Sequence, residues 1–146
     1  MGMKNGNRKN MSILDFIDRK TVTVQNDFIE SLSTAIIVIG KGLWYLFNNR
    51  EKNERCVYFT AVDVLKYGGC KAKAFAKHDE CGITIDLFNR ARYVLYSLVE
   101  RRYLTHEPGI ISIYGLCVES ELWKVMERAK EYGDIVEFIR RVVIND

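Results

Sequence analysis

Four cysteines and two histidines are the residues whose types could bind a metal or attack a substrate. Three of them, Cys70, His78 and Cys81, form a C-x7-H-x2-C pattern. With Cys56 or Cys117 as a fourth ligand they would suit a tetrahedral zinc site. The spacing matches no common zinc-finger pattern, so free thiols are expected first. A Cys70–Cys81 disulfide and a metal- or redox-sensing site stay open as alternatives, and the expectation is no bound metal or cofactor.

The sequence offers no arrangement typical of an enzyme. A nucleophilic cysteine or serine needs a nearby histidine base, and neither His78 nor His106 lies in a recognisable catalytic motif. A Gly-rich phosphate loop, an HExxH motif and a paired acidic motif are all absent from the sequence. We therefore expect a protein without enzymatic activity, and no small-molecule substrate is evident.

The composition is that of an ordinary globular protein, but the charge is unevenly distributed. The 146 residues are 48% hydrophobic and 28% charged, which suits one folded domain. No apolar run approaches the roughly 18–20 residues of a membrane helix, and the N-terminus lacks an apolar signal segment, so a cytoplasmic protein is expected. The formal charge is +3 over residues 1–26, zero over 27–70, +3 over 71–105 and −3 over 106–146. A basic middle suits a polyanionic partner, although solvated surface charge explains such an imbalance equally well.

Apolar spacing and capping residues predict a mainly helical chain with a small β hairpin. Residues 1–11 are expected to be a mobile basic arm, and residues 12–146 a single domain. Thr60 and Asp63 are spaced as a capping box, and Thr84 and Ser120 are expected to cap the helices that follow them. Asp134 is expected to cap the last helix after a break at Gly133. The predicted helices cover residues 27–48, 61–67, 84–102, 120–131 and 135–144.

The predicted strands lie on either side of the second and third of these helices in the sequence. One short strand is expected at 57–59, and two more at 103–106 and 110–116. Pro108 and Gly109 lie between the last two strands, and this dipeptide is typical of a type II turn. Residues 103–116 therefore predict a hairpin.

The order of elements over residues 57–116 resembles a winged helix-turn-helix domain of the kind found in archaeal and bacterial transcription regulators. The recognition helix of such domains often ends in Leu-x-x-Leu-x-x-x-Gly-Leu-Ile, and the segment from Leu95 to Leu104, LYSLVERRYL, has that frame. Arg102 stands where glycine is usual, so the turn after the helix must differ or accept strain. The connection between the two helices, around residues 68–83, is also longer than usual.

The resemblance implies that helix 84–102 enters the major groove of double-stranded DNA. Polar residues opposite its apolar face would contact bases, since asparagine pairs with adenine and arginine with guanine. Lysines of the preceding connection and a histidine of the hairpin would contact phosphate, and Arg92, beside the inner face, would contact phosphate or a partner helix. The expected DNA-binding residues are Thr84, Asn89, Arg90, Tyr93, Ser97, Lys71, Lys73, Lys77 and His106.

The hairpin carries little charge for a DNA-reading wing. Its turn region contains Glu107, which is unfavourable beside a phosphate, and no lysine or arginine. This counts against deep insertion and keeps open a winged-helix module that binds protein in a larger assembly.

The helices outside residues 57–116 carry more apolar residues than a minimal winged domain needs. Either they complete one core, or part of their surface pairs two subunits, with Trp44 and Phe138 as candidate contacts. Two-fold pairing would present two recognition helices to successive major grooves. The sequence therefore predicts a homodimeric transcription regulator that binds double-stranded DNA.

Overall fold

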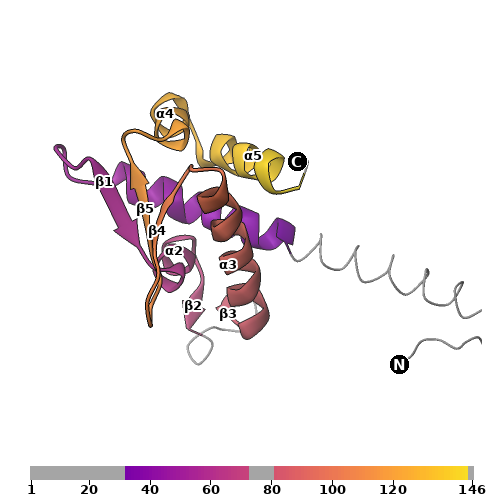
Figure 1. Cartoon of the computed structure of the whole chain (residues 1–146). Coiled ribbons are helices and arrows are strands. Elements are labelled where there is room, and N and C mark those ends of the chain that lie inside the picture. The colour runs from indigo at the N-terminus through magenta and orange to yellow at the C-terminus, as the bar shows by residue number, and fades with distance from the viewer. Residues whose placement is uncertain (1–31, 73–80, 145–146) are drawn as a thin grey trace, which may run out of the picture. The chain divides into compact units, whose positions relative to one another are not determined.

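The computed structural model describes residues 32–72 and 81–144, which belong to one compact unit (Figure 1). This unit is mainly helical, with a small three-stranded antiparallel sheet. The sequence predicts an arm at residues 1–11 and a domain that begins at residue 12. Both the arm and this boundary lie outside the described residues. None of the helices within the described ranges is long and apolar enough to cross a membrane.

The first described helix covers residues 32–48. The sequence predicts this helix over residues 27–48, and residues 27–31 lie outside the described part of the chain. The apolar stripe that predicted it is buried, from Leu32 through Ile36, Ile39 and Leu43 to Phe47. A glycine lets the next helix, α2 (Ala61–Tyr67), approach this helix closely. A Cβ atom on Gly42 would overlap the carbonyl oxygen of Val64 in α2.

α2 (Ala61–Tyr67) begins at the predicted capping box. The Thr60 hydroxyl accepts a hydrogen bond from the Asp63 backbone N–H at 3.1 Å, and the Asp63 carboxylate accepts one from the Thr60 N–H at 3.0 Å. α3 (Ile85–Glu100) follows the N-cap Thr84 and buries its apolar face, made of Ala91, Val94, Leu95 and Leu98.

Between α2 and α3 the chain forms a short parallel pair of strands, β2 (Lys71–Ala72) and β3 (Gly82–Ile83). A disulfide between Cys70 and Cys81 joins the two ends of this excursion.

The three-stranded sheet is made of β1 (Cys56–Phe59), β4 (Thr105–Glu107) and β5 (Ile113–Cys117), in the order β1-β5-β4. The last two form the expected hairpin, but its strands are shorter than predicted. Residues 108–112, here called the hairpin tip, connect them. Gly109 has no positive φ, so the predicted type II turn at 107–110 is wrong.

Two helices follow the sheet. α4 (Glu121–Arg128) begins after its N-cap Ser120, as predicted, and ends three residues before the expected limit. α5 (Tyr132–Val143) begins earlier than predicted, so the expected break at Gly133 is wrong. Asp134 lies inside the first turn, where its carboxylate accepts hydrogen bonds from the N–H groups of Lys130 and Glu131.

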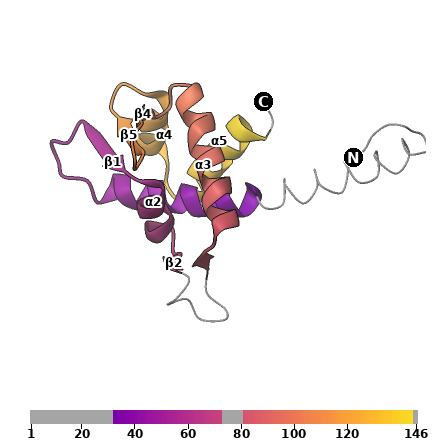
Figure 2. The same ribbon diagram turned by 60° about the horizontal axis from the view of Figure 1, so that its bottom comes forward.

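The elements separate into two ends (Figures 1 and 2). α4 and α5 lie at one end. The hairpin tip, the β2–β3 pair and the start of α3 lie at the other, which Figure 2 brings forward. This second end holds Lys71, Thr84, Asn89 and Arg90, four of the described residues for which a nucleic-acid role was predicted.

Candidate nucleic-acid interface

The candidate interface is built on the exposed face of α3. Because its inner face is fixed in the core, the residues between those contacts project outward. Asn89 and Arg92 are exposed, and Tyr93 and Tyr96 expose 45% and 55% of their surfaces. The face also carries Ile85, which is 80% exposed at the first position of the helix.

Three of the residues predicted to contact DNA from this helix form hydrogen bonds within it or are half-buried. The hydroxyl of Thr84 accepts a hydrogen bond from the Leu87 N–H at 3.0 Å, so this exposed residue caps the helix. The hydroxyl of half-buried Ser97 donates to the Tyr93 carbonyl oxygen at 3.0 Å. Arg90 is also half-buried and already interacts within the molecule.

Arg92 is more accessible than the sequence indicated. It is exposed, and its guanidinium carbon lies 5.9 Å from the centroid of the Phe88 ring. It is therefore the cation of α3 best placed to meet a phosphate.

The predicted phosphate contacts outside α3 are only partly described. Lys71 is exposed in β2, whereas Lys73, Lys77 and His78 lie outside the described residues. His106 is half-buried in β4, and its ring stacks on Tyr114 with centroids 5.0 Å apart. Its Nε2 atom is buried and has no hydrogen-bond partner among the described residues, so His106 supports the hairpin more than it reaches outward.

A cleft of about 440 Å³ separates the hairpin tip from the helices. Apolar side chains dominate its lining, including Val62, Phe88 and Ile111, with Arg92 and three hydroxyl residues beside them. The sequence analysis missed this cleft. Ile110 and Ile111 were placed in the return strand, and only the longer connection seen here puts them at the surface.

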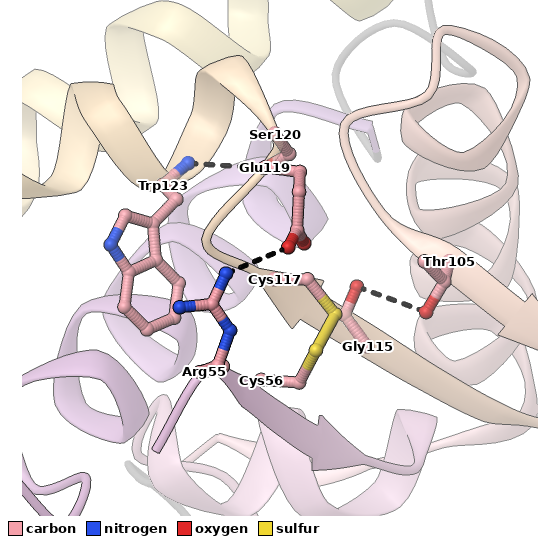
Figure 3. Close-up of a disulfide and its surroundings, with 8 residues drawn as sticks. All are labelled: Arg55, Cys56, Thr105, Gly115, Cys117, Glu119, Ser120 and Trp123. Atoms are coloured by element: carbon pink, nitrogen blue, oxygen red, sulfur yellow. Dashed lines mark hydrogen bonds and ion pairs between the residues drawn. A yellow bond between two sulfur atoms is a disulfide. The ribbon is translucent and has the colours of Figure 1, made fainter. Parts of the chain in front are cut away.

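Both pairs of cysteines form disulfides, so the expectation of free thiols is wrong. Cys70–Cys81 was an open alternative, but the pairing of Cys56 with Cys117 was not foreseen. These two residues face each other across β1 and β5, near the Arg55–Glu119 ion pair of 3.2 Å (Figure 3). Glu119 and the two sulfur atoms lie close enough to bind a metal together, but the bonded sulfurs offer no thiolate.

No protein-family model, curated protein or solved structure matches this chain. What the interface does must therefore follow from its own residues and their positions.

Proposed function

We propose that this chain is a winged helix-turn-helix protein that binds double-stranded DNA, with α3 in the major groove. The supporting observation is topological. A helix, β1, α2, α3, β4 and β5 follow in that order, and β5 lies between β1 and β4 in the sheet. This is the arrangement by which winged domains place a helix and a hairpin side by side.

The residues on the outer face of α3 suit base and phosphate contacts. Asn89 can form two hydrogen bonds with the major-groove edge of an adenine, and Arg92 can contact a guanine or a phosphate. Tyr93 and Tyr96 add exposed rings with hydroxyl donors on the same face. The N-cap residue Thr84 and the buried inner face of α3 hold these side chains in fixed positions relative to one another. Recognition of bases requires such fixed positions.

We further propose that the protein binds DNA as a homodimer and regulates transcription. Two copies related by a two-fold axis would place two α3 helices on successive major grooves. The role in transcription is inferred from this mode of binding.

A protein-binding winged module is the second candidate. The uncharged hairpin tip and the largely apolar cleft behind it favour this alternative. A metal-sensing regulator is less supported, since all four cysteines are bonded and offer no thiolate. A redox-sensing regulator would act by reduction of these disulfides and stays an alternative.

Titration with mixed genomic duplex DNA at two salt concentrations tests the proposal. A DNA-binding protein should lose affinity steeply as salt rises, because phosphate contacts release counterions. No binding, or binding that ignores salt, would favour the protein-binding alternative.

A further inference from the structure

The hairpin tip exposes two adjacent isoleucines at the end of the molecule that holds the start of α3 (Figure 1). Ile110 is fully exposed, at 106% of its reference surface, and Ile111 is 67% exposed. Residues 108–112, PGIIS, contain no charged side chain. Such an apolar projection is unfavourable in water and indicates contact with an apolar surface.

The base of the hairpin is rigid enough to hold this projection in place. Three rings stack across the sheet: Phe59 and Tyr114 have centroids 5.9 Å apart, and Tyr114 and His106 have centroids 5.0 Å apart. Pro108 restricts φ at the point where β4 ends. The packing of these rings in the sheet therefore holds the hairpin tip in a fixed position.

We take one sugar–phosphate strand as the occupant of the cleft beside the tip, which Phe88 and Arg92 of α3 also line. In B-form DNA such a strand separates the major groove from the adjacent minor groove. A strand in the cleft would meet apolar side chains along its sugars, the hydroxyls of Thr60 and Ser112, and the cation of Arg92. With α3 in the major groove, the tip then faces the minor groove.

We propose that Ile110 and Ile111 act as an apolar wedge that enters the minor groove and partly unstacks a base step. This inference rests on the proposed DNA binding and defines the class of DNA preferred. Apolar wedges of this kind kink a duplex by about 20–90° towards the major groove. Pyrimidine–purine steps unstack most easily, so sites with a TA or CA step opposite the tip bind best. The wedge also accounts for a wing without basic residues, because its contacts are with base faces.

DNA bending and base unstacking test the wedge directly. The probe is a duplex taken from the genomic fragments that the wild-type chain retains, with energy-transfer dyes at its ends. Copies with 2-aminopurine at successive positions report local unstacking. The variant Ile110→Ser/Ile111→Ser removes the wedge, and Tyr132→Ser removes an exposed apolar surface from α5, at the other end.

The wild-type chain should bend the duplex and raise 2-aminopurine fluorescence at one step. The double variant should leave the bound duplex nearly straight and bind it about a hundredfold more weakly, because the burial of each of the two isoleucines accounts for about tenfold. Tyr132→Ser should behave as the wild type. A duplex that is bound but straight, or bent equally by the double variant, would overturn the wedge and leave DNA binding standing. Failure of the wild type to bind any duplex would overturn both.

Discussion

Arg92 is the charged side chain of α3 that lines the cleft, beside Phe88. In the proposed complex it contacts a phosphate, which adds affinity without sequence preference. We expect Arg92→Ala to weaken binding to all duplexes alike, and to reduce the slope of log affinity against log salt by about one. Fluorescence anisotropy titrations over a series of salt concentrations measure both quantities.

A matched variant separates this contact from a general loss of positive charge. Arg128 is exposed on α4, at the end remote from the hairpin tip. Arg128→Ala removes the same charge and should leave the salt slope unchanged. Equal effects of the two substitutions would argue against a local contact at Arg92.

Arg102 is the residue at which the backbone is strained. Its φ is +65°, in the left-handed region that favours glycine. The turn it makes is closed by hydrogen bonds from the N–H groups of Arg102 and Tyr103 to carbonyls of the last turn of α3. We expect Arg102→Gly to raise the free energy of unfolding by about 1 kcal/mol, measured by urea denaturation.

The neighbouring arginine provides the control. Arg101 has a φ of −90°, which any residue adopts, so Arg101→Gly should give no such gain. If Arg102→Gly lowers stability as Arg101→Gly does, the strain at residue 102 is not what limits this turn.

At the scale of elements, the two disulfides close chain segments of very different length. Cys56 and Cys117 are 61 residues apart in sequence, whereas Cys70 and Cys81 are 11 apart. Loop-closure entropy grows with separation, so the first should contribute about 4 kcal/mol to stability and the second about 3 kcal/mol. Cys56→Ser/Cys117→Ser should therefore unfold at a lower denaturant concentration than Cys70→Ser/Cys81→Ser. The reverse order would show that strain or residual structure outweighs loop length.

The elements that the sequence predicted best depend on neighbouring residues. The Thr60–Asp63 capping box and the caps at Thr84 and Ser120 act over three residues, and each lies where predicted. At Arg102 the sequence left two possibilities, a different turn or backbone strain, and the positive φ of this residue corresponds to the second.

Features that depend on distant residues could not be predicted in this way. The pairing of Cys56 with Cys117 follows from the register of β1 against β5, which no local pattern specifies. The exposure of Ile110 and Ile111 follows from where β5 begins to pair, and their sequence alone favours a buried strand. The early start of α5 depends on Asp134, whose carboxylate suits a cap and a first-turn position alike.

At the scale of the whole molecule, the extra helices mainly complete the core of one chain. Leu122, Trp123, Ile135 and Ile139 are buried, and half-buried Phe138 packs edge-on against Tyr103 at 5.0 Å between centroids. This reduces the surplus apolar surface that suggested a dimer. On helix 32–48, Ile37 and Tyr45 stay exposed, and the Tyr45 ring stacks on Tyr67 with centroids 4.9 Å apart.

The dimer is still expected, with this smaller surface as its contact. Sedimentation should report about twice 17.0 kDa at micromolar concentration. Tyr45→Glu should shift the chain towards monomer and lower DNA affinity with it. Tyr58→Glu, on the exposed side of β1, serves as the control and should leave the mass unchanged. A chain that stays monomeric at high concentration while binding DNA tightly would contradict the dimer.

Photo-crosslinking from α3 tests most directly whether this helix meets the duplex. Tyr93 is exposed on the outer face of α3, and Tyr132 is comparably exposed at the start of α5. Each is replaced in turn by benzoylphenylalanine, and the protein is irradiated with labelled duplex DNA. The account predicts efficient crosslinks from position 93 and few from position 132. Crosslinks from position 132 alone, or from neither position, would contradict the claim that α3 lies in the groove.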